Sequence, residues 1–218
     1  DVLGSRGLGD VYKRQDFSKE KFKMNLKSNK VNVIKILPGG VVTAKDTAEI
    51  ELDANGEFVR NPEVDLVKVA VVERHQGTGN VACGFLKGYG IKEGAVALSV
   101  AHDSHNIIVV GVNDEEMEFA VNSLIEQEGG IVLVKEGKVI ESMPMPIAGL
   151  MSDQSGEWVD QKLTDIHEKA YEELGICGDV EPVMTLCFMS LAVIPEIKLT
   201  DMGLFDVTTF SFIPVEVE

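Results

Sequence analysis

The chain has 218 residues, a length that fits one full domain or one domain with part of another and excludes a large barrel enzyme with its accessory domains. Its composition, 44% hydrophobic and 26% charged, is that of a folded protein and excludes disorder over the whole length. A net charge of −16 repels phosphate backbones and anionic lipid, so we expect no nucleic-acid partner and no membrane partner.

The three cysteines predict a reducing environment. Cys83, Cys177 and Cys187 lack C-x-x-C spacing, and an odd number in so long a chain indicates reduced thiols and a cytoplasmic protein. Cys83 and Cys187 are predicted to be core residues of apolar strands, and Cys177 to be exposed.

The longest strongly apolar stretch, residues 183–194, is shorter than the roughly 18 residues that cross a bilayer.

The N-terminal part divides into two predicted segments. Residues 1–15 contain three glycines and no apolar periodicity, which indicates an adapter-like or vector-like segment; a natural flexible basic arm is the alternative. From Val31 onward, short β-rich pieces and the hairpin signal Asn55-Gly56 predict three or four small strands. A turn-like stretch then places a domain boundary near residue 64, which separates a segment 16–64 from a domain 65–218.

The second segment predicts strands and helices in irregular alternation. The predicted strands are 66–73, 81–87, 95–101 and 107–112, followed by a hairpin around Glu136-Gly137 that ends before Met143-Pro144. Apolar residues at helical spacing predict one helix over 115–128, after Asn113, and a second from Ser155 to Leu174. Because the elements do not repeat as βαβ units, we expect an α+β fold with a mixed sheet and two main helices.

Three of the four histidines lie in two polar motifs that end apolar strands. Glu73-Arg74-His75 follows one strand, and Ala101-His102-Asp103-Ser104-His105-Asn106 links two others. Such strand ends are where rigid scaffolds usually present functional side chains. We predict that the two motifs are neighbours in one sheet, with side chains that meet in a polar pocket.

The chemistry of these motifs has several interpretations. His102 and His105 with Asp103 offer ligand types suited to Zn, Mn or Fe, although this spacing is a weak metal signal. The alternatives are a site that faces a substrate, and an Asx turn with histidines that are satisfied locally. Glu73, Arg74 and His75 offer an ion pair, an anion-binding guanidinium and an acid–base imidazole, or simply a solvated strand end.

The order of motifs from about Val31 to Asp206 resembles the C-terminal region of bacterial adenine deaminases. The resemblance rests on the motifs ERH (73–75), AHDSHN (101–106), PIAGLMS (146–152) and PEIKLTDMGLFDV (195–207). Gln76-Gly77 departs from the family pattern, in which a second histidine and a small residue are expected. The resemblance implies that residues 16–64 are the remnant of a small β domain flanking a barrel, and that 65–218 are the family's C-terminal α+β domain.

The same resemblance implies the reaction and its participants. The family belongs to the amidohydrolase superfamily, in which a (β/α)8 barrel with Mn²⁺ or Fe²⁺ activates water to convert adenine to hypoxanthine and ammonia. The barrel's metal-binding His-x-His is absent from this sequence, so the chain alone is expected to be inactive and to bind no metal tightly. The residues we transfer as substrate-site candidates are Glu73, Arg74, His75, His102, Asp103, Ser104, His105 and Asn106.

Three hypotheses follow for the role of the chain. In the first, it is the accessory portion of an adenine deaminase of purine salvage, and its polar strand ends close over the mouth of the barrel. In the second, it is a noncatalytic packing or oligomerisation domain with structural histidines. The third, a self-contained metal hydrolase, is disfavoured because no complete ligand set or separate general base is evident. The expected partners are adenine, the barrel and further copies in a homo-oligomer.

Overall fold

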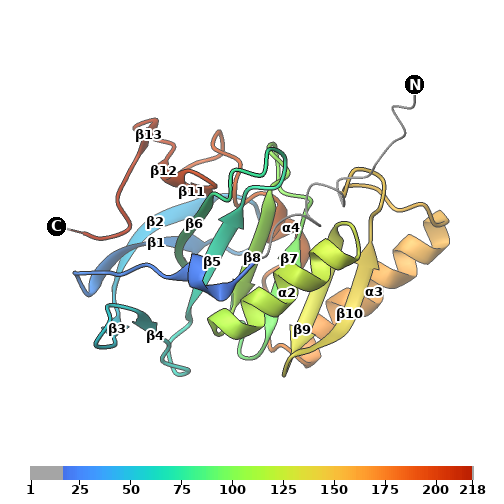
Figure 1. Cartoon of the computed structure of the whole chain (residues 1–218), viewed down its shortest axis with the longest axis horizontal. Helices are drawn as coiled ribbons and strands as arrows, with labels where there is room; N and C mark the ends of the chain where they lie inside the picture. The colour runs from blue at the N-terminus through green and yellow to red at the C-terminus, as the bar shows by residue number, and fades with distance from the viewer. Residues whose placement is uncertain (1–16, 218) are drawn as a thin grey trace.

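The structure, a computed structural model, describes residues 17–217, and the predicted segment 1–15 lies outside this part of the chain. Its central feature is an eight-stranded sheet in the order β10-β9-β7-β8-β5-β6-β1-β2 (Figure 1). Neighbouring strands are antiparallel except β1 and β6, which are parallel. The predicted α+β class with a mixed sheet is confirmed.

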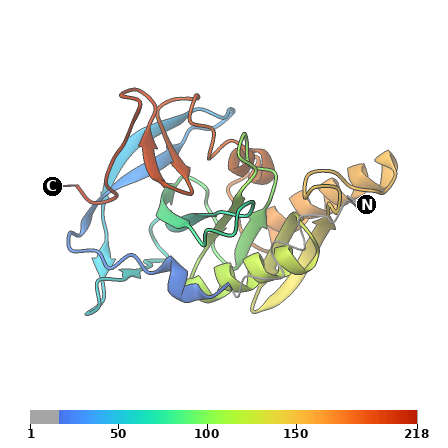
Figure 2. The same cartoon turned by 45° about the horizontal axis from the view of Figure 1, so that its top comes forward.

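The large sheet comprises β1 (Lys30–Ile36), β2 (Thr43–Glu49), β5 (Leu66–Val72), β6 (Val81–Lys87), β7 (Ala95–Leu98), β8 (Ile107–Gly111), β9 (Gly130–Lys135) and β10 (Lys138–Pro144). A small hairpin joins β3 (Glu51–Leu52) to β4 (Phe58–Val59). A three-stranded sheet follows near the C-terminus, with β11 (Ile197–Thr200), β12 (Gly203–Asp206) and β13 (Ser211–Phe212). Figure 2 shows this smaller sheet next to β2, and it also contacts β6.

Helix α2 (Asp114–Glu126) covers one face of the large sheet. It begins after Asn113, whose side chain accepts a hydrogen bond from the N–H of Glu116, as a helix N-cap should. Its buried residues Met117 and Val121 pack against β-strand side chains such as Val109 in a core of small and branched residues. The predicted helix over 115–128 is confirmed.

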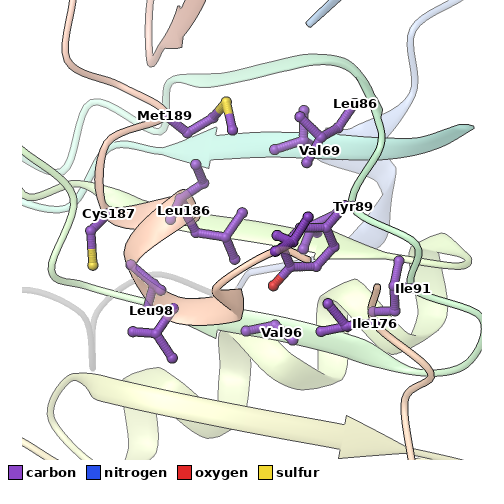
Figure 3. Close-up of a cluster of buried hydrophobic side chains, with 14 of the residues drawn as sticks. Val69, Leu86, Tyr89, Ile91, Val96, Leu98, Ile176, Leu186, Cys187 and Met189 are labelled. Atoms are coloured by element: carbon purple, nitrogen blue, oxygen red, sulfur yellow. The ribbon is translucent and has the colours of Figure 1, made fainter. Parts of the chain in front are cut away.

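Helices α3 (Gly156–Glu172) and α4 (Pro182–Cys187) cover the opposite face. Ser155 caps α3 in the predicted place. Figure 3 shows Leu186 of α4 directed into a cluster that includes Val69, Leu98 and Tyr89. The Tyr89 hydroxyl donates to the carbonyl oxygen of Pro182 at 2.8 Å, so this buried hydroxyl is paired.

Two predicted details are wrong. Cys187 lies in α4 rather than in a strand, because Pro182 at the first helical position and Glu181 as N-cap start a helix within the apolar run. Strand β10 continues through Pro144 instead of ending before Met143. It is an edge strand of the sheet, where a residue without an N–H is tolerated.

The N-terminal strands share the sheet of the larger segment. β1 pairs with β6 through Ile34 and Leu86, so the hydrogen-bonded ladder crosses the predicted boundary at residue 64. The division into segments 16–64 and 65–218 stays a prediction. In the part of the chain from 17 to 217, no helix is long and apolar enough to cross a membrane.

Candidate functional site at the motif edge

The two histidine motifs lie side by side at one end of the sheet. β5 and β8 are antiparallel neighbours, with Val72 paired to Ile107, so the residues after β5 lie beside those before β8. The Nε2 atom of His75 is 2.6 Å from the carbonyl oxygen of Ser104. The predicted proximity of the two motifs is therefore confirmed, and we name the loops 73–80, 101–106 and 146–152 the motif edge.

Glu73 builds its own loop. Its carboxylate accepts hydrogen bonds from the backbone N–H groups of His75, Gln76 and Thr78, and from the Thr78 hydroxyl. Burial opposes the charge, but these hydrogen bonds outweigh it and lower the pKa of Glu73 below its ordinary value. A carboxylate that is fully occupied in this way fixes the loop 75–78 and has little capacity left to serve as a base.

Arg74 is buried, with 1% of its surface exposed. Its backbone N–H donates to Asn106 Oδ1 at 3.2 Å, and its Nε donates to the carbonyl oxygen of His105. Nη1 and Nη2 donate to the carbonyl oxygen of Ala148 at 3.2 and 3.1 Å. Burial lowers the pKa of Arg74 to about 10. Asn106 thus contacts Arg74 rather than closing an Asx turn.

The histidines and one aromatic residue form the more exposed part of the motif edge. The His102 ring lies edge-on to His105, with centroids 5.3 Å apart, and 4.8 Å from the ring of Phe188, which follows α4. The His102 N–H also donates to Cys187 O at 2.8 Å, which ties this loop to the end of α4. Burial, and then the charges of His102 and Arg74, lower the pKa of His105.

The His75 and His105 rings differ in which ring nitrogens have a hydrogen-bond partner. A carbonyl oxygen only accepts, so Nε2 of His75 carries the proton in the contact with Ser104, and Nδ1 is the acceptor of the neutral ring. His105 Nδ1 is buried without a hydrogen-bond partner in residues 17–217. Imidazole rings can accept, donate or relay a proton, and aromatic faces of this kind can also contact a planar heterocycle.

Sequence reasoning missed the third loop of the motif edge as a structural part of the site. Ala148 accepts from Arg74, and Gly149 O accepts from the Ser99 hydroxyl at 2.5 Å. Ser99 Oγ in turn accepts from Gly130 N. The sequence marked this loop through the motif PIAGLMS (146–152) and its small residues, but it did not indicate the contact, since Arg74 and Ala148 are 74 positions apart.

The expected shared polar pocket is not what forms. Glu73 and Arg74 turn inward, at 6% and 1% exposed, whereas His75, Asp103 and Ser104 lie on the surface. A cavity of about 480 Å³ lies instead at the other end of β5, where Lys68, Arg60 and the start of α2 line it. The motif edge is therefore an exposed polar surface with a buried support.

A metal centre does not fit the side chains that the structure describes. Over residues 17–217, no three side chains of His, Cys, Asp or Glu gather closely enough to hold an ion. His102, Asp103 and His105 do not form such a group of three, and their role in metal binding stays a prediction. Burial raises the pKa of Cys83 and of Cys187 to about 12, which disfavours a thiolate ligand.

Fold and site together define an α+β domain that presents histidine-bearing strand ends supported by a buried arginine. Residues 40–211 match the family described as "Adenine deaminase C-terminal domain". The chain belongs to that family.

Relatives extend this match to nearly the whole chain. It is 67% identical over 216 residues to "Adenine deaminase 2" of Desulfotalea psychrophila, which covers 99% of this chain and 37% of that protein. The adenine deaminases of Ligilactobacillus salivarius and Bacillus subtilis are 48% and 44% identical, over 94% and 96% of this chain. The chain therefore spans little more than a third of the length of these relatives.

Proposed function

We propose that the chain is the C-terminal portion of an adenine deaminase, which hydrolyses adenine to hypoxanthine and ammonia. The observation that supports this most directly is the convergence of His75, His102 and His105 at one edge of a domain of this family. The motif edge faces the catalytic part of the enzyme and helps to orient the purine or water there. We also propose a cytoplasmic homo-oligomer that acts in purine salvage.

The metal of the reaction belongs, in this proposal, to the barrel. Mn²⁺ or Fe²⁺ would there lower the pKa of a bound water. The described side chains form no ion site of their own, so this chain contributes polar groups and shape. Its imidazoles are groups that could pass or hold a proton within hydrogen-bond reach of a substrate.

The proposal is tested in a full-length chimera in which this chain replaces the matching portion of the Desulfotalea psychrophila relative. We expect His75→Ala and His105→Ala each to lower kcat/KM for adenine by about a hundredfold or more, because a positioned proton-transfer group contributes about 10²- to 10⁴-fold. His167→Ala is the matched control, since His167 lies on α3 and contacts Glu181 instead of the motif edge.

Two results would contradict the proposal. The first is ammonia release by the chimera that both substitutions leave unchanged while the variants remain folded. The second is an equal loss in the His167→Ala control, which would indicate a general effect on stability. Either result would favour a packing role for the domain.

A further inference from the structure

Arg74 joins all three loops of the motif edge. It follows β5 in the first loop, donates through Nε to His105 O in the second, and donates through both Nη atoms to Ala148 O in the third. Its backbone N–H adds the bond to Asn106, the last residue of the second loop. Removing this side chain would leave the three loops without a shared support.

The partners of Arg74 are unusual for a buried cation. Buried charges in proteins are generally paired with an opposite charge, yet the side-chain partners of Arg74 among residues 17–217 are backbone carbonyl oxygens. A guanidinium suits this arrangement because its planar fork can donate in two directions at once. A lysine ammonium at the same place keeps the charge but not the fork.

The third loop is shaped to receive the guanidinium. Gly149 has φ +71°, a left-handed conformation that favours glycine, and a Cβ at this position would collide with Arg74 Nη1. The Ser99 hydroxyl donates to the carbonyl oxygen of Gly149. The close approach of the third loop to the guanidinium therefore requires both Arg74 and a glycine at position 149.

The backbone that Arg74 holds is the backbone that positions the histidines. His105 O accepts from Arg74, and the preceding carbonyl, that of Ser104, accepts from His75 Nε2. A shift of the backbone at Ser104 and His105 therefore moves the His105 ring and the acceptor that holds the His75 ring. Misplacement of such groups by about 1 Å can reduce turnover by about a hundredfold.

We propose that Arg74 is a positioning residue that sets the placement of His75 and His105 through the Ser104–His105 backbone. The inference rests on the proposed function only for its effect on turnover. Its structural part stands on the described chain alone. Arg74 does not itself contact the substrate in this proposal, because the guanidinium is buried and all three of its nitrogen atoms donate to backbone carbonyl oxygens.

The structural part is tested by NMR of the histidine ring nitrogens in this chain, comparing wild type with Arg74→Lys. The variant retains a positive charge, so a change in the histidine signals reports the loss of the planar guanidinium and its several donors, not the loss of charge. We expect the ring signals of His75 and His105 to move and the His75 Nε2 proton to exchange faster, with His167 unchanged as the internal control. Unchanged His75 and His105 signals would overturn the proposal, as would equal shifts of all three.

Gly149→Ala is the second variant, which keeps the test decisive if Arg74→Lys does not fold. It presses on the guanidinium from the third loop, so the same two histidine signals should move. Signals that stay in place in this folded variant would overturn the proposal.

In the chimera, Arg74→Lys should lower kcat for adenine at least about tenfold with KM within about twofold, because misplacement affects turnover more than uniform binding. A change in KM alone would overturn the role in positioning. If the NMR signals move while His75→Ala and His105→Ala leave kinetics unchanged, the proposed function fails and the structural role of Arg74 stands.

Discussion

Strand β5 has a buried cation near each end, and the two cations have different kinds of hydrogen-bond partner. Lys68, 5% exposed, donates to both carboxylate oxygens of Asp114 at 2.8 and 3.0 Å and to Phe22 O. Arg74, 1% exposed, donates through its side chain to the carbonyl oxygens of His105 and Ala148. The first arrangement is an ion pair that fixes α2 against the sheet, and the second is a set of hydrogen bonds that fixes three loops.

The difference shows where the domain can tolerate change. The charged partner of Lys68 is a side chain, Asp114, so a substitution of Asp114 can compensate for the loss of Lys68. The partners of the Arg74 side chain are backbone carbonyl oxygens, which no substitution removes, so no second substitution can compensate for the loss of Arg74. We therefore expect the motif edge to depend on one side chain, and the opposite end of β5 to depend on a pair.

The largest expected effect is that of Arg74→Met. Three charge-assisted hydrogen bonds are lost and the carbonyl oxygens of His105 and Ala148 lose their guanidinium partner, which should lower the free energy of unfolding by about 3–5 kcal/mol. Lys68→Met should lower the free energy of unfolding by about 2–3 kcal/mol. This is less than for Arg74→Met because the side chain of Asp114 is 26% exposed, so water can solvate the unpaired carboxylate.

A further substitution sharpens this contrast. Asp114→Asn should restore part of the stability in the Lys68→Met background, since it removes the unpaired carboxylate. The same Asp114→Asn substitution should restore nothing in the Arg74→Met background. Urea unfolding of the single and double variants measures both couplings, and recovery in the Arg74→Met background would contradict the distinction.

The next effect compares two glycines with similar backbone conformations. Gly149 and Gly137 have φ of +71° and +66°, but a Cβ would meet Arg74 at Gly149 and no atom within 4 Å at Gly137. Gly137→Ala should therefore cost only the strain of the left-handed conformation, about 1 kcal/mol, and Gly149→Ala at least about 1 kcal/mol more. Equal losses in thermal or urea unfolding would show that the guanidinium has room to move away.

Much of this architecture was predictable from local patterns, and the support of the motif edge was not. The apolar run of β5 and the Asn113 cap of α2 are readable because strand periodicity and capping act over a few residues. The proximity of His75 to the 101–106 loop was predictable because both follow or precede buried strands. The contact from Arg74 to Ala148 depends on tertiary packing across 74 positions, which no local pattern encodes.

The smallest expected effect concerns Lys198, a buried lysine that also has a carbonyl partner. Its Nζ donates to Val41 O at 2.9 Å, and burial lowers its pKa to about 8. Between about pH 8 and the ordinary value of 10.5, the unfolded chain binds more protons at this site than the folded chain, so the contribution of Lys198 makes stability rise with pH.

The measurement is urea unfolding of wild type and Lys198→Met from pH 8 to 9. Wild type should gain up to about 1 kcal/mol relative to the variant over this interval. Staying below pH 9 limits the opposite contribution of Cys83 and Cys187, whose raised pKa values make stability fall at higher pH. A constant difference between the two proteins would show that the ammonium keeps its ordinary pKa in the fold.

The central claim, that the motif edge faces the bound purine, is tested most directly by energy transfer in the chimera. An acceptor dye is attached at Ser104→Cys or at Val139→Cys, both in a background with the exposed Cys177 replaced by serine. Val139 is exposed near the β9–β10 turn, at the opposite end of the sheet. With bound 2-aminopurine as the fluorescent donor, we expect higher transfer efficiency to the dye at residue 104 than to the dye at residue 139. Equal efficiencies, or a higher one at residue 139, would contradict the account.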